Sequence, residues 1–141
     1  MADDAYLGFT YSRPTIALLN DGRWAAITGN GDAPELDEME LLILYLDGGI
    51  DGSWSEAGDY LTIYSESGVD TGGLSSPTVI DTDGDGDADR AYAGDTEGNL
   101  WVFDLSSENP DNWEVANGGD PLFENTRDDP QPITVKPTVV R

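Results

Sequence analysis

Glu40-Leu41-Leu42-Ile43-Leu44-Tyr45-Leu46-Asp47 is the most apolar run of this 141-residue chain. Taken alone, the run fits two structures. A helix is consistent with Asp32 as its cap and Pro34 in its first turn. A strand buried on both faces is equally consistent, because the apolar character is unbroken from Leu41 onward. A repeat along the chain decides for the strand.

Several anchors of the sequence recur at nearly one spacing. They are Pro14-Thr15, which returns as Pro77-Thr78 and Pro137-Thr138; Leu44-Tyr45-Leu46-Asp47, which aligns with Trp101-Val102-Phe103-Asp104; and Trp54, which aligns with Trp113. The offsets are 63 (77 minus 14), 60 (137 minus 77), 57 (101 minus 44) and 59 (113 minus 54). A period of this length with about four strands per unit predicts β-propeller blades, somewhat longer than those of the common repeat families.

The rest of the composition agrees with an all-β fold. Seventeen glycines and eight prolines separate short apolar runs. Strands are predicted at Thr15–Leu19, Arg23–Thr28 and Tyr60–Tyr64, and Asn20-Asp21-Gly22 predicts a tight hairpin turn between the first two. We therefore expect antiparallel four-stranded blades.

The predicted domain is a partial propeller over residues 1–141. Its first blade covers 6–72, its second blade covers 73–130, and 131–141 supplies the first strand of a third. About two blades cannot close a propeller of at least four blades, so the chain is expected to be a fragment of a longer protein. The exposed strand edges at Thr15–Leu19 and Pro132–Val140 predict self-association.

The stretch Asp81-Thr82-Asp83-Gly84-Asp85-Gly86-Asp87-Ala88-Asp89 places a carboxylate at every second position. A loop with oxygen ligands at positions 1, 3, 5, 7 and 9, and a glycine at position 6 for the sharp turn, is suited to calcium. Position 7 binds through its carbonyl in such loops. The candidate metal ligands are Asp81, Asp83, Asp85, Asp87 and Asp89. The alternative is a solvated acidic linker, which most charge runs are.

The loop is predicted to be an expanded hairpin. In the first repeat Asn20-Asp21-Gly22 joins strands one and two, whereas Asp81–Asp89 makes the corresponding connection in the second. An EF-hand would need a glutamate at position 12, which is Tyr92 here. Arg90, directly after the loop, is expected to be an ordinary strand-edge charge.

Composition excludes several classes of partner. With 29 acids against 6 bases, the formal net charge is -23, which repels nucleic acid and anionic lipid. No run approaches the ~20 apolar residues of a membrane span. The start of the chain, Met1–Ala5, lacks the features of a signal peptide, so an exported protein would have its leader elsewhere.

Catalysis finds little support in the residue types. The chain has no histidine and no cysteine, which removes most triads, thiol nucleophiles and zinc sites. We expect no enzyme. The alternatives are a propeller-type enzyme fragment, either a glycosidase with a carboxylate pair or a quinoprotein-like dehydrogenase, and a purely structural acidic halophilic module. The four tryptophans are expected to pack within or between blades: Trp24, Trp54, Trp101 and Trp113.

Several further runs of the sequence are distinctive, and they are Leu7–Pro14, Asn20–Gly31, Gly73–Thr78, Ala91–Asp95, Gly98–Leu105, Pro121–Phe123 and Gln131–Thr134. These runs resemble the C-terminal propeller of PilY/PilC proteins. The resemblance implies a secreted protein at the tip of type IV pili, with roles in pilus biogenesis, twitching motility and surface or host adhesion. It implies pilus components or surface ligands as partners of the full-length protein, and an extracellular location. A calcium loop that regulates pilus function in that family maps onto Asp81–Asp89, although an aspartate at position 7 departs from its usual pattern.

Overall fold

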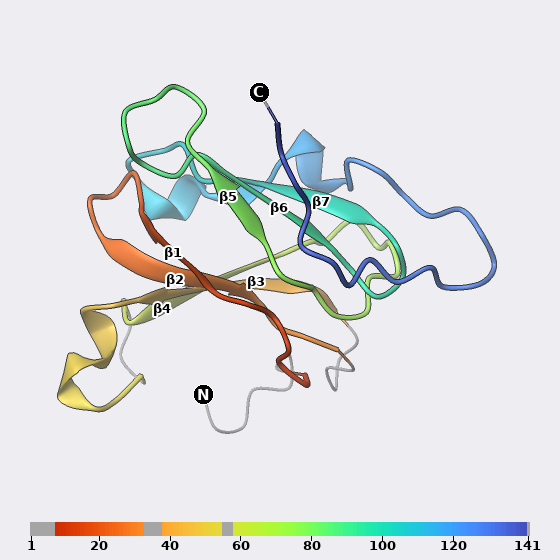
Figure 1. Cartoon of the computed structure of the whole chain (residues 1–141), viewed down its shortest axis with the longest axis horizontal. Helices are drawn as coiled ribbons and strands as arrows, with labels where there is room; N and C mark the ends of the chain where they lie inside the picture. Colours follow the sequence, from red (N-terminus) through yellow and green to blue (C-terminus); the bar gives the residue numbers. More distant parts are fainter. Residues whose placement is uncertain (1–7, 33–37, 55–57, 141) are drawn as a thin grey trace.

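The computed structural model describes residues 8–32, 38–54 and 58–140 (Figure 1). The predicted first-blade start at residue 6 and the helix-opening Pro34 lie outside these ranges. The strands are β1 (Thr15–Leu18), β2 (Trp24–Gly29), β3 (Glu40–Tyr45), β4 (Tyr60–Tyr64), β5 (Thr78–Ile80), β6 (Arg90–Gly94), β7 (Leu100–Asp104) and β8 (Glu114–Val115). Three short 3-10 helices are η1 (Gly48–Asp51), η2 (Pro110–Asn112) and η3 (Asn117–Gly119). No helix in the described ranges has the length and apolarity to cross a membrane.

The strands form two antiparallel sheets with the same topology. The first has the order β1-β2-β3-β4 and the second the order β5-β6-β7-β8. Each strand pairs with the next in sequence, as in a propeller blade, so the two sheets are called the first and second blade. The prediction of all-β, four-stranded antiparallel blades is confirmed.

The apolar run that decided the fold is a central strand. β3 pairs with β2 on one side and with β4 on the other. Leu41 and Ile43 are fully buried, and Leu42 on the opposite face is only 3 % exposed. The prediction of a doubly buried strand is confirmed, and it explains why the run lacks the polar alternation of an edge strand.

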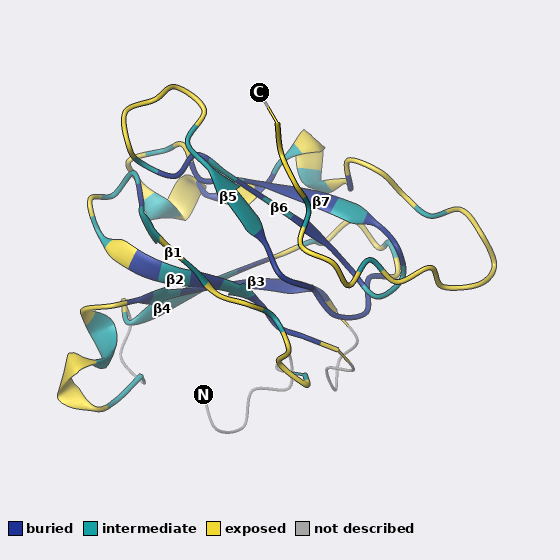
Figure 2. Ribbon diagram, viewed as in Figure 1, coloured by how far each residue is buried: buried dark blue, intermediate teal, exposed yellow. Residues whose placement is uncertain are grey.

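The two blades pack face to face around one core (Figure 2). Small residues lie opposite large ones across neighbouring strands: Ala93 pairs with Trp101 and Ala91 with Phe103. The alanines and both rings are completely buried. Full burial of each ring contributes about 2–3 kcal/mol to the free energy of unfolding. Alternating small and large residues fill the space between the blades.

The strand register confirms the repeat but shifts its alignment. Gly29 pairs with Leu41 in the first blade, and Gly94 pairs with Leu100 in the second. A side chain at Gly29 would meet the Leu74 carbonyl of the next unit at 2.3 Å, and one at Gly94 would meet Ile133 at 2.3 Å. These equivalent positions give an offset of 59 for the third strand (100 minus 41), where the sequence alignment used 57. A slip of two residues keeps every side chain on its face, so alternation alone does not reveal it.

The segment after the second blade contacts that blade at a point equivalent to the contact between the first and second blades. The Thr15 hydroxyl donates to the Pro77 carbonyl, and the Thr78 hydroxyl donates to the Pro137 carbonyl at the equivalent point of the next unit. Figure 1 shows the C-terminal segment crossing the second blade. Residues 131–140 form no strand within the described part of the chain, and their assignment as the first strand of a third blade stays a prediction.

The tryptophan prediction holds for three of four residues. Trp101 and Trp113 are buried and Trp54 is half-buried. Trp24, by contrast, is 54 % exposed. Its neighbour Ala25 points into the core, and successive residues of a strand point to opposite faces, so Trp24 lies on the outer face of the first blade.

Candidate metal centre

The acidic loop joins β5 and β6, the first two strands of the second blade. Asp81 follows β5 directly and Asp89 directly precedes β6. The Asp89 amide donates to the Ile80 carbonyl at 2.9 Å and closes the base of the loop. Asp89 is buried, whereas the tip around Asp85 is exposed (Figure 2). The loop therefore has a fixed base and a solvated tip.

Three of the five predicted ligands converge. Carboxylate oxygens of Asp81, Asp83 and Asp89 all lie within 4.8 Å of one another. The carboxylates of Asp85 and Asp87 are not part of this cluster, and Asp85 Oδ1 accepts a hydrogen bond of 2.9 Å from the Asp87 amide. That any of these five aspartates binds a metal ion stays a prediction.

Asp81 is held in place by two glycine amides. Its Oδ1 accepts from Gly84 N at 2.6 Å and its Oδ2 accepts from Gly86 N at 2.9 Å. Both glycines have positive φ, +90° and +103°, which turns their amides back toward the start of the loop. The hydrogen bond from Gly84, then that from Gly86, holds the pKa of Asp81 below its usual value. Asp81 is thus an ionised, oriented carboxylate.

Asp89 is the buried member of the cluster. Its Oδ2 accepts from Thr82 N at 2.6 Å and from Thr82 Oγ1 at 2.5 Å, and its Oδ1 accepts from Asn20 Nδ2 at 3.3 Å. Burial opposes ionisation, but the hydrogen bonds from Thr82 outweigh it, so the pKa of Asp89 is lowered. Asp89 is thus an ionised carboxylate whose two oxygens are both held by hydrogen bonds.

The donor set fits a hard divalent cation. All three converging groups are carboxylates, which suit calcium and not the softer metals that prefer nitrogen or sulfur. Loss of hydration, followed by repulsion from Asp85 and Asp81, raises the pKa of Asp87, which shows how strongly negative the loop is. Arg90 does not relieve this charge, because it pairs with Asp104 at 3.0 Å across β6 and β7. A bound cation would neutralise part of this negative charge.

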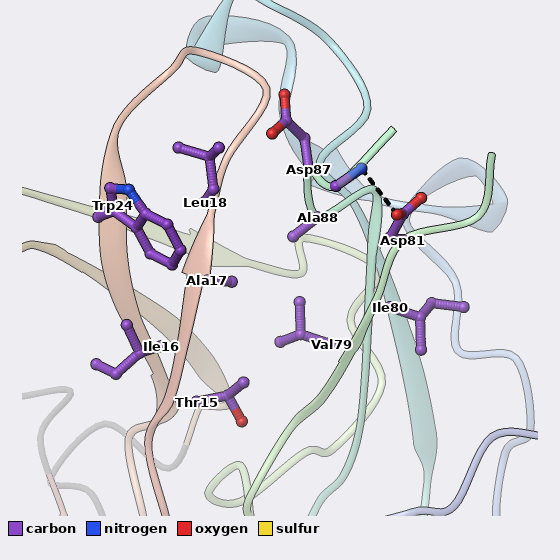
Figure 3. Close-up of a pocket in the computed structure, with 11 residues that line it drawn as sticks. Thr15, Ile16, Ala17, Leu18, Trp24, Val79, Ile80, Asp81, Asp87 and Ala88 are labelled. Carbon is purple, nitrogen blue, oxygen red and sulfur yellow. Dashed lines mark hydrogen bonds between the residues drawn. The ribbon is translucent and has the colours of Figure 1, made fainter. Parts of the chain in front are cut away.

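A groove of about 290 Å³ lies beside the loop, between β1 and β5 (Figure 3). Its walls are mainly apolar, with Ala17 of β1 and Val79 of β5 on opposite sides. Asp87 lies at its upper end in this view, and Gly86, whose amide donates to Asp81, also lines it. The acidic loop therefore lies at the junction of the two blades. Sequence reasoning did not find this, and in particular missed the contact with Asn20.

Comparison with known proteins identifies the family. The family model described as "PilY1 beta-propeller domain" matches residues 3–141. The type IV pilus biogenesis factor PilY1 of Pseudomonas aeruginosa (strain UCBPP-PA14) is 39% identical over 98% of this chain. A PilY1 homolog of Xylella fastidiosa is 38% identical over 81% of it. The chain spans 13% and 8% of these two relatives.

A solved structure agrees with the sequence comparisons. The crystal structure of the Pseudomonas aeruginosa PilY1 C-terminal domain is similar with a TM-score of 0.78 and 35% identity. The similarity covers 99% of this chain and 31% of that one. Two blades thus correspond to a part of a larger propeller. The chain belongs to the PilY1 beta-propeller domain family.

Proposed function

We propose that this chain is the calcium-binding, non-enzymatic part of a protein that serves type IV pilus biogenesis. The observation that carries the proposal is the convergence of Asp81, Asp83 and Asp89 within 4.8 Å. The relatives support the pilus role, because they are named as type IV pilus biogenesis factors. The location that follows is the cell surface, at or near the pilus.

The ion would act as a structural clamp. Asp81 directly follows β5 and Asp89 directly precedes β6, so a cation shared by their carboxylates would tie the two arms of the hairpin together. It also neutralises charges that otherwise repel one another and splay the loop. Because the ion binds the folded loop and not the unfolded chain, it raises the free energy of unfolding by mass action.

In the full-length protein, this clamp would serve as a regulatory element. Calcium would favour one geometry of the second blade and, with it, contacts to pilus components or to surface ligands. Twitching motility and adhesion would then depend on external calcium. The chain is a small part of its relatives, so the partner surfaces belong to the larger protein.

The direct test is calorimetric titration of the chelator-treated chain with calcium. We expect one site with a dissociation constant of roughly 10⁻⁴–10⁻³ M, as in other extracellular sites. Asp81→Asn/Asp83→Asn is expected to abolish the binding heat. The matched control is Asp128→Asn/Asp129→Asn, which removes the same charge from two exposed residues outside the loop and should leave binding unchanged.

Two outcomes would contradict the proposal. One is no binding heat at millimolar calcium. The other is equal stabilisation by molar sodium or potassium chloride, which would favour an acidic halophilic module that screens its charge without a specific site. A substrate turnover or a bound quinone in the full-length protein would instead favour the enzyme alternatives.

A further inference from the structure

The first blade reaches into the metal loop of the second through one side chain. Asn20 lies in the turn between β1 and β2. Its Nδ2 is within hydrogen-bond distance of Ala88 O at 3.1 Å, Leu105 O at 3.1 Å and Asp89 Oδ1 at 3.3 Å. These partners are 68, 85 and 69 residues away in sequence. This one amide therefore contacts both the base of the acidic loop and Leu105, the residue after β7.

Backbone contacts fix the position of this side chain. The Ala88 amide donates to the Leu18 carbonyl at 2.9 Å, and Leu19 forms a parallel bridge with Ala88. Leu105 N in turn donates to Asp89 O at 2.8 Å. Leu19, Ala88 and Leu105 are all buried. The turn of the first blade and the base of the metal loop are therefore one packed unit.

We propose that Asn20 is a positioning residue for the metal site, and that it makes cation binding in the second blade depend on docking of the first. The proposal rests on the proposed function, because it assumes that Asp89 is a ligand. Asn20 bonds Oδ1 of Asp89, whereas Thr82 bonds Oδ2. The two contacts together set the orientation of the carboxylate, and the one from Asn20 comes from the first blade.

The expected loss of calcium affinity on replacing Asn20 follows from the behaviour of other metal centres. Groups that hydrogen-bond to a ligand fix its orientation, and their loss typically costs 10–100-fold in metal affinity. The Asn20 contact is at the long end of the hydrogen-bond range, so we expect the lower limit, about 10-fold. Linkage is reciprocal, so calcium should also strengthen the packing of the two blades by the same factor.

The first experiment compares calcium affinity in the intact 141-residue chain. Asn20→Ala is expected to raise the calorimetric dissociation constant about 10-fold. The matched control is Ser76→Ala, which removes another uncharged contact between the blades, the 2.8 Å bond from Arg13 N to Ser76 Oγ, outside the loop. Its affinity should stay at the wild-type value. Equal affinities of Asn20→Ala and wild type, or equal losses in both variants, would overturn the proposal.

The second experiment needs no calcium. In chelator, urea unfolding of Asn20→Ala, Asp89→Ala and the double variant forms a thermodynamic cycle. We expect coupling between Asn20 and Asp89 and additivity between Asn20 and Asp83, whose side chain Asn20 does not contact. If Asn20→Ala does not fold, Asn20→Ser, which keeps a short donor, replaces it in both experiments.

The two experiments separate the two proposals. A wild-type chain that binds no calcium defeats the proposed function and the linkage together, while the cycle still decides whether Asn20 positions Asp89. A wild-type chain that binds calcium, with Asn20→Ala unchanged and the cycle additive, defeats only the inference about Asn20.

Discussion

The two blades share one strand order but differ in the turn that joins their first two strands, β1 and β2 in the first blade and β5 and β6 in the second. In the first blade, Leu19 N donates to Arg23 O at 3.0 Å and Gly22 N to Leu19 O at 2.8 Å, so the turn closes on its own backbone. In the second, the connection runs from Asp81 to Asp89 and its glycine amides turn inward to a carboxylate. The first hairpin needs no ion. The second gathers like charges that only a cation or water can balance.

The connection between the second and third strands differs in the opposite direction, because it is longer in the first blade than in the second. Between β2 and β3 the chain takes residues 30–39, whereas between β6 and β7 it takes only 95–99. Asn30 and Asp95 begin these connections and are both fully buried. Asn30 Oδ1 accepts from Leu74 N of the second blade, whereas Asp95 accepts from residues of its own turn. The strand order is thus the same in both blades. The buried residue that begins the connection bonds the neighbouring blade in the case of Asn30 and its own turn in the case of Asp95.

The largest effect is expected from breaking the buried turn at Asp95. Its carboxylate accepts four hydrogen bonds of 2.7–2.8 Å, from Gly98 N, from Asn99 N and Nδ2, and from Trp101 Nε1. Asp95→Ala removes the acceptor of the buried Trp101 Nε1 and Asn99 N, whereas Asn99 Nδ2 keeps its bond to Asp70 O, and it should cost about 3–4 kcal/mol in the free energy of unfolding. Urea denaturation measures it.

Asn30→Ala is the matched variant at the equivalent position in the first blade. We expect a smaller loss, because its hydrogen bonds to Glu38 O, Glu40 N and Leu74 N are made by a neutral amide and are weaker than bonds to a buried carboxylate. A loss at Asn30 that equals or exceeds the loss at Asp95 would contradict this account of the two connections.

A middle-sized effect is expected from the glycines of the two hairpins. Gly22 and Gly86 have φ of +81° and +103°, and an added Cβ meets nothing within 4 Å at either position. Gly22→Ala and Gly86→Ala should therefore each cost about 1 kcal/mol from backbone strain alone. Only Gly86→Ala should also weaken calcium binding, because Gly86 N holds Asp81. Equal calcium affinities in the two variants would show that this hydrogen bond does not orient the site.

Much of the fold could be predicted because repetition is visible in sequence. The Pro-Thr anchors and the apolar run at Glu40–Asp47 sufficed for two four-stranded blades. What sequence could not give depended on neighbours in space. Trp24 was expected to pack within or between blades, but it is 54 % exposed and lines the groove between β1 and β5. The strand expected at 131–141 stays a prediction, because pairing partners are not encoded in the segment itself.

The metal centre shows the same division. Spacing alone indicated the five aspartates, since a ligand at every second position is a local property. It could not separate Asp81, Asp83 and Asp89, which converge, from Asp85 and Asp87, because convergence depends on how Gly84 and Gly86 turn the backbone. Asn20 carried no signal beyond its place in an Asn-Asp-Gly turn, because its contact with Asp89 spans 69 residues.

The smallest expected effect is the pH dependence that distinguishes Asp95 from the uncharged Asn30. Burial raises the pKa of Asp95 above its ordinary 3.8, although the hydrogen bonds from Trp101 and Asn99 oppose the shift. Between 3.8 and the raised value, the folded state binds more protons than the unfolded state, so stability from this group falls as pH rises through that window and is level above it.

Asp95→Asn, which makes the second blade resemble the first, removes this titration. The difference in urea midpoint between wild type and Asp95→Asn should therefore shift against wild type as pH rises from about 3.8. A difference that moves in favour of wild type over that range would mean that the four hydrogen bonds, and not burial, dominate at Asp95.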